Sequence, residues 1–202
     1  MNKSLHLLVA VAMTGALFSL TTGCAPASAP ISYHSLVAAD PAPRASVPQE
    51  SRMALMVGPV SIPDLLKNSQ IATGGSGGRY RLSEQHRWAG EVDREFARAI
   101  AEQLVRGLNT EQVSLYPAGQ YLEPKLQIVL DVVAMDGELG KEAKLDVRWS
   151  LVDPKSKTAL LTRRTALAEQ PADSGYDAWI EAQRRNIAKL GQEIATAIRA
   201  RR

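Results

Sequence analysis

Residues 126–168 decide the fold, because they contain three extended segments separated by short turns. The first segment reads LQIVLDVVAM (126–135) and is apolar on both faces, which is typical of a central strand. The second, KLDVRWSLV (144–152), alternates between apolar and polar residues and predicts a strand with one face in water. Turn residues follow each of them, and TALLTRRTALA (158–168) returns as a third strand. The stretch therefore predicts three neighbouring antiparallel strands.

Two longer segments, one on each side of this stretch, have the period of an amphipathic helix. From Ser83 to Leu108, apolar side chains recur every four residues beginning at Trp88, and charged side chains occupy the other faces. A second apolar stripe, from Tyr176 to Ile198, lies within residues 175–199. Helices of this kind bury one face against a sheet, so we expect Trp88 to pack in the core.

Shorter apolar runs at residues 31–37, 53–60 and 113–116 predict three further strands. Together the segments predict the α/β (α+β) class, as a two-layer sandwich of a mixed, largely antiparallel sheet with two long amphipathic helices. The chain is long enough for one compact domain and a tether, and we expect a single domain over residues 31–202.

The segment from Leu65 to Leu82 is the least regular part of this domain, and it contains the glycine run GGSGG (74–78). The run lacks the lysine and the spaced glycines of phosphate-binding loops, so we expect no nucleotide cofactor. Arg79, Tyr80 and Arg81 follow it and combine cationic and aromatic side chains, as interfaces do. We expect a surface loop whose Arg79, Tyr80 and Arg81 contact a partner, with a flexible loop that binds nothing as the alternative.

The only cysteine, Cys24, follows an apolar N-terminal segment, and Lys3 supplies a positive charge ahead of that segment. This order is typical of a secretory signal peptide, so we expect residues 1–23 to be removed. A lone cysteine cannot form an intramolecular disulfide. Cys24 is therefore expected at the first mature position, where bacterial lipoproteins carry a diacylglyceryl thioether. An ordinary signal peptide with a fortuitous cysteine and an uncleaved N-terminal helix are the alternatives.

Acylation at Cys24 would also decide where the protein lies. Two or more acyl chains give a stable membrane anchor, and the proline-rich residues 24–30 suit a tether. Ala25 stands where an aspartate would favour retention at the inner membrane. In a bacterium with two membranes, this predicts the periplasmic face of the outer membrane.

Charge and motif content argue against nucleic-acid binding and catalysis. The 24 basic and 21 acidic side chains nearly balance, so no nucleic-acid partner is expected. His34 lies in a predicted strand and His86 at the start of the predicted helix, without the ligand spacing of a zinc site. The glycine run 74–78 has the letters Gly-x-Ser-x-Gly, but it lies in the predicted surface loop and not at the strand-to-helix turn of a nucleophile elbow. We expect no catalytic residues, no metal and no cofactor.

Five short motifs follow Cys24 in order: SYHSL (32–36), VGPVSIPDLL (57–66), SQI (69–71), RWA (87–89) and YDAW (176–179). Together they resemble the ABC-type transport auxiliary lipoprotein family (paraquat-inducible protein C-like). The resemblance implies a non-catalytic subunit of an envelope-spanning lipid transport system. Its implied partners are a mammalian-cell-entry-type transport protein and the inner-membrane permease, with this subunit docking the conduit at the outer membrane. Assembly as a homo-oligomer stays open, since the sequence fixes no stoichiometry.

Two other functions stay open at this stage. A small α/β domain on an acylated tether also suits an outer-membrane lipoprotein that regulates a peptidoglycan synthase or an assembly machine. A lipid hydrolase is the enzymatic alternative, and it would need a catalytic group that no sequence motif identifies.

Overall fold

The computed structural model describes residues 29–37, 53–117 and 123–201. The chain divides after Pro30 into two compact units, and every helix and strand described lies in the second, residues 31–202. The predicted signal peptide (1–23) and Cys24 lie outside the described residues.

A five-stranded mixed sheet is the larger of two sheets. Its strands run in the order β5 (Val113–Leu115), β2 (Leu55–Ser61), β6 (Leu126–Asp136), β7 (Ala143–Asp153) and β8 (Thr158–Glu169). β2 pairs in parallel with β5 and β6, whereas β7 pairs antiparallel with β6 and β8. β6 is therefore the central strand, as its two apolar faces predict.

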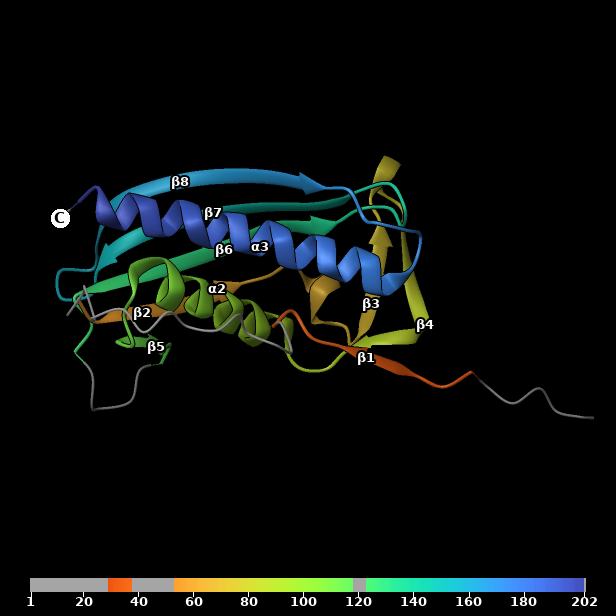
Figure 1. Cartoon of the computed structure of the whole chain (residues 1–202), viewed down its shortest axis with the longest axis horizontal. Helices are drawn as coiled ribbons and strands as arrows, with labels where there is room; N and C mark the ends of the chain where they lie inside the picture. Colours follow the sequence, from red (N-terminus) through yellow and green to blue (C-terminus); the bar gives the residue numbers. More distant parts are fainter. Residues whose placement is uncertain (1–28, 38–52, 118–122, 202) are drawn as a thin grey trace, which may run out of the picture. The chain divides into compact units, whose positions relative to one another are not determined.

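Two helices cover one face of this sheet (Figure 1). α2 (Val92–Leu108) packs on β2 and β5, α3 (Tyr176–Arg199) packs on β7 and β8, and the helices also pack on each other. The apolar face of β7 points into this layer, where Leu145, Val147, Trp149 and Leu151 are almost fully buried. The predicted class, an α/β sandwich with two long helices, is confirmed.

The other face of the five-stranded sheet carries cross-strand ion pairs. Arg164 donates two hydrogen bonds to Asp146, of 2.9 and 2.6 Å, and Arg148 donates one to Asp131 over 3.1 Å. The hydrogen bond from Arg164 lowers the pKa of Asp146. This polar face explains the alternation of residues 144–152, because odd positions enter the core and even positions meet solvent.

A second, three-stranded sheet has the order β1 (Ser32–His34), β4 (Tyr80–Trp88) and β3 (Gln70–Gly74). β1 is parallel to β4, and β3 and β4 form an antiparallel hairpin closed by a 3₁₀ turn, η2 (Ser76–Gly78). A second 3₁₀ turn, η1 (Asp64–Lys67), precedes β3. The predicted irregular loop over residues 65–82 is therefore largely a hairpin.

A pair of glycines joins the two sheets. Gly74 donates a hydrogen bond to the Gly137 carbonyl over 2.6 Å, and Gly137 donates one back over 3.0 Å. Gly137 has a φ of +129°, and a Cβ there would overlap the Glu142 carbonyl oxygen. Gly74 has a φ of +112°, so both positions favour glycine.

The first helix begins later than its pattern predicts. Residues 83–88 belong to β4, and helix α2 starts only at Val92. Trp88 and Val92 are four residues apart, so the sequence pattern of the helix includes Trp88. In the structure, the end of β4 and a bend separate the two residues. Pairing with β1 and β3 overrides that local period, since strand formation depends mainly on tertiary neighbours.

Candidate partner-binding site

The three residues predicted to contact a partner lie at the start of β4. Arg79 precedes the strand, and Tyr80 and Arg81 open it. They line a cavity of about 680 Å³ whose other walls come from Thr73, Gly74, Glu138, Leu139 and Tyr176. The structure thus places all three side chains around one cavity, although Tyr80 and Arg81 lie on a strand instead of a loop.

Tyr80 is held at this cavity by the end of β6. Its hydroxyl donates a hydrogen bond to Asp136 over 3.2 Å, and its side chain is 43% exposed. Burial raises the pKa of Tyr80, and the negative charge of Asp136 raises it further. Tyr80 therefore stays a neutral hydrogen-bond donor with much of its ring open to solvent.

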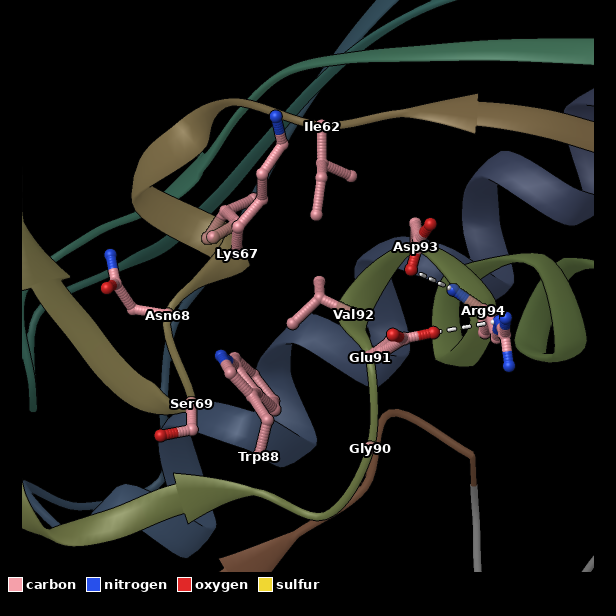
Figure 2. A pocket seen from close by; sticks show the side chains of 11 residues that line it. Ile62, Lys67, Asn68, Ser69, Trp88, Gly90, Glu91, Val92, Asp93 and Arg94 are labelled. Atoms are coloured by element: carbon pink, nitrogen blue, oxygen red, sulfur yellow. Dashed lines mark hydrogen bonds and ion pairs between the residues drawn. The ribbon is translucent and has the colours of Figure 1, made fainter.

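A second cavity, of about 690 Å³, lies at the opposite end of β4; we call it the Trp88 cavity. One side of its lining lies between Ile62 and Ser69, and the other between Trp88 and Arg94 (Figure 2). The main-chain amide of Trp88 donates to the Ser69 carbonyl over 2.7 Å and holds the two segments together. Parts of three sequence motifs, at residues 57–66, 69–71 and 87–89, thus meet at one cavity.

The lining of the Trp88 cavity combines apolar side chains from both segments with charged side chains at the rim. Ile62, Leu66, Trp88 and Val92 supply the apolar side chains. Lys67 forms an ion pair with Asp64 over 2.6 Å, and Arg94 forms one with Glu91 over 2.8 Å. The hydrogen bond from Lys67 lowers the pKa of Asp64. The rim therefore carries charges of both signs that are already paired.

Trp88 is buried as predicted, with only 4% of its surface exposed. Its indole Nε1 is also buried and has no hydrogen-bond acceptor among the described residues. Figure 2 shows this nitrogen on the side of the ring that faces the space enclosed by the labelled side chains. The indole of Trp149, by contrast, donates to Thr165 over 3.0 Å. Trp88 thus presents an unused donor where the cavity begins.

The two histidines that looked isolated in sequence lie side by side. His34 Nε2 and His86 Nδ1 are 2.9 Å apart, and His34 Nδ1 lies 3.3 Å from Asp177. The His86 ring stacks on Tyr176 with 4.1 Å between centroids. Burial lowers the pKa of His34, an effect that Asp177 opposes and that His86 and Arg184 reinforce. Parallel pairing of β1 with β4 explains this contact, which sequence spacing does not reveal.

This histidine cluster ties β1 to the rest of the domain. Arg184 of α3 donates two hydrogen bonds to the Ser35 carbonyl, of 3.1 and 2.7 Å. The Ser35 hydroxyl donates to Glu95 of α2, and Leu36 is buried in the core. No hydroxyl of the described residues is hydrogen bonded to either imidazole ring. These contacts hold β1 and the residues after it against α2 and α3, as a structural clasp.

The described part of the chain contains neither a cluster of metal-ligating side chains nor a membrane-spanning helix. There, no group of three or more His, Cys, Asp or Glu side chains has the arrangement of a metal site. No helix among the same residues has both the length and the hydropathy needed to cross a membrane. The predicted lipidation site, Cys24, stays a prediction because it lies outside this part.

Comparison with known proteins identifies the family of this domain. The model of the family described as "ABC-type transport auxiliary lipoprotein component" matches residues 34–195. The chain belongs to this family of transport auxiliary lipoproteins, and the resemblance drawn from its short motifs is confirmed. None of the curated proteins compared with the chain matches it.

Two solved structures share its fold. A crystal structure described as that of an uncharacterized protein has a TM-score of 0.66 at 20% identity, covering 84% of this chain and 99% of that chain. Protein XCC0632 from Xanthomonas campestris has a TM-score of 0.63 at 16% identity, covering 83% of this chain and 93% of that chain. At such identities the similarity extends to the fold alone.

Proposed function

We propose that this chain is a non-catalytic, lipid-anchored subunit of an envelope-spanning lipid transport system of the mammalian-cell-entry type. The observation that carries the proposal is membership of the transport auxiliary lipoprotein family over residues 34–195. The described site residues agree with a subunit that binds instead of catalysing, because neither cavity has a histidine or a cysteine in its lining. The expected partners are the transport protein and its inner-membrane permease.

The proposal places the protein on the periplasmic face of the outer membrane. Cys24 would carry the acyl chains, and residues 24–30 would form the tether below the domain. A domain held in this way can meet the distal end of a conduit that starts at the inner membrane. The subunit would therefore dock and align that conduit.

Arg79, Tyr80 and Arg81 are the proposed partner contact. They surround the cavity at the start of β4, and Tyr80 exposes 43% of its surface there. Aromatic and arginine side chains are the residue types that most often contribute binding energy at interfaces. A partner that covers this cavity would bury Tyr80 and give both guanidinium groups acceptors.

A crosslinking pull-down from native envelopes, read by mass spectrometry, tests this function. The acylated full-length protein should recover the mammalian-cell-entry-type protein or its permease. Cys24→Ala should move the protein from the membrane fraction to the soluble fraction and lower that recovery. Replacing Arg79, Tyr80 and Arg81 with alanine should lower recovery without releasing the protein from the membrane.

Other outcomes of the same experiment would contradict the proposal. Recovery of a peptidoglycan synthase alone would favour the regulator instead. Lipid hydrolysis by the purified protein that is lost in a His34→Ala variant would contradict the non-catalytic role. Full recovery by the triple variant would remove the partner contact from the proposal and leave the rest intact.

A further inference from the structure

We propose that the Trp88 cavity binds an uncharged, apolar segment of the partner polypeptide, with a main-chain carbonyl accepting a hydrogen bond from Trp88 Nε1. This inference rests on the proposed function, because the partner is the transport protein to which the subunit would dock. It adds a second contact at the opposite end of β4 from Arg79, Tyr80 and Arg81.

The unused indole donor is the first argument. Buried polar groups are almost always hydrogen bonded, so a buried N–H without an acceptor calls for an explanation. Trp88 Nε1 is such a group among the described residues, and its ring lines the cavity. Trp179 Nε1 also has no acceptor there, but Trp179 does not line this cavity. An acceptor brought by a ligand would therefore satisfy Trp88 specifically.

The start of helix α2 is the second argument. The first amides of a helix have no acceptor within the helix. Glu91, at the N-cap of α2, makes no side-chain capping bond, and Gly90, Glu91 and Val92 all line the cavity. Residues at the start of α2 and the indole donor of Trp88 thus line the same cavity, and a polypeptide offers successive carbonyl acceptors to donors of both kinds.

Charge decides between a polypeptide and a lipid headgroup. Lys67 and Arg94 are the lining cations and Glu91 and Asp93 the lining anions, so the rim is neutral as a set. Arg94 is already paired with Glu91, and Asp93 accepts a hydrogen bond from the Arg94 amide over 2.8 Å. A rim of this kind has no excess positive charge for a phosphate. An uncharged peptide segment meets no repulsion there.

The extent of the apolar lining favours a side chain over an acyl chain. Ile62, Leu66, Trp88 and Val92 form one short apolar wall, and polar or charged residues border it. A volume of about 690 Å³ lies within the usual range of ligand pockets. That space accommodates a few residues of a peptide with one apolar anchor, whereas a long acyl chain would extend beyond the apolar wall.

Binding of the purified mammalian-cell-entry-type protein from the same organism tests the inference. The probe is titrated against full-length acylated wild type, Trp88→Phe and Ser69→Tyr. Trp88→Phe removes the N–H and keeps an aromatic ring, so affinity should fall about tenfold, the loss expected for one buried hydrogen bond. Ser69 is exposed at the cavity, so Ser69→Tyr should fill it without disturbing the core and should weaken binding at least as much.

Trp179→Phe is the matched control. Trp179 is fully buried and its indole also lacks an acceptor among the described residues, but it lies outside the cavity. Its replacement should leave partner affinity unchanged. In ¹⁵N-indole spectra of the wild type, addition of the partner should shift the Trp88 resonance and leave those of Trp149 and Trp179 in place.

The outcomes separate this inference from the proposed function. If the wild type does not bind the transport protein, the proposed function fails and the inference fails with it. If the wild type binds and both cavity variants bind equally well, the inference alone is overturned. It is also overturned if Trp179→Phe weakens binding as much as Trp88→Phe, or if phosphatidylglycerol vesicles shift the Trp88 resonance and the partner does not.

Discussion

The five-stranded and three-stranded sheets are stabilised in different ways. β7 of the larger sheet buries every second side chain beneath helix α3, whereas β4 of the smaller sheet buries only Ser83 and Trp88. Truncating a buried apolar side chain should therefore lower the free energy of unfolding far more in the larger sheet than truncating an exposed one in the smaller sheet. The five-stranded sheet therefore supplies most of the stability of the domain. The two candidate binding cavities lie at the two ends of β4, in the three-stranded sheet.

Truncating a core residue of the larger sheet should have the largest effect. Trp149 is 1% exposed and its indole donates a hydrogen bond to Thr165, so Trp149→Ala leaves a large cavity and removes that hydrogen bond. We expect a loss of about 3–5 kcal/mol in the free energy of unfolding, measured by urea denaturation.

Leu82→Ala, in the smaller sheet, is the matched comparison. Leu82 is 44% exposed, so its truncation should change stability by no more than about 0.5 kcal/mol. Equal losses in the two variants would contradict the distinction between the sheets.

The same distinction explains what the sequence predicts well. The three strands predicted over residues 126–168 differ from β6, β7 and β8 by at most one residue at each end. Their alternation records burial on one face, which is a local pattern. Helix α3 is predicted equally well, because its apolar stripe contacts the core along its whole length.

The smaller sheet is poorly predicted for a physical reason. Five of the nine residues of β4 are exposed, so the strand has little apolar alternation to reveal it. Its pairing with β1 joins residues 32–34 to residues 86–88, a contact that no local pattern records. The His34–His86 contact depends on that pairing, and the Trp88 cavity depends on the hydrogen bond between Trp88 and Ser69. The sequence predicts neither. Of the residues that line the two cavities, composition predicts a partner contact only for Arg79, Tyr80 and Arg81.

An intermediate effect is expected at the joint between the sheets. Gly137→Ala forces a side chain into a φ of +129° and against the Glu142 carbonyl, while Gly137 also holds Gly74 through two hydrogen bonds. We expect a loss of about 1–3 kcal/mol. Hydrogen exchange should accelerate at Gly74 and along β3 before it changes in β6 and β7.

Gly90→Ala is the control for that substitution. A Cβ at Gly90 would make only an ordinary contact, 3.5 Å from Glu95, without a positive φ. Stability and exchange should therefore stay close to wild type. Slow exchange at β3 in Gly137→Ala would show that the three-stranded sheet does not depend on the glycine bridge.

The smallest effect is a pH dependence that belongs to the smaller sheet. Burial lowers the pKa of His34, so below pH 6.5 the unfolded chain binds a proton more readily than the folded protein. The stability associated with neutral His34 is therefore complete above pH 6.5 and is lost as the pH falls toward the folded pKa. Asp177 opposes this loss, while His86 and Arg184 increase it.

The pH window keeps this effect apart from those of the carboxylates. Arg185 and Lys189 lower the pKa of Glu169, whose contribution is lost only below its ordinary value of 4.5. A change in the urea midpoint between pH 5.5 and 7.5 therefore reflects mainly the protonation of histidine side chains. The wild type should be less stable at pH 5.5, and His34→Gln should flatten that difference while keeping a polar side chain beside His86. If the variant keeps the full pH dependence, the proton is taken up elsewhere, and the clasp that holds β1 is not the group that titrates.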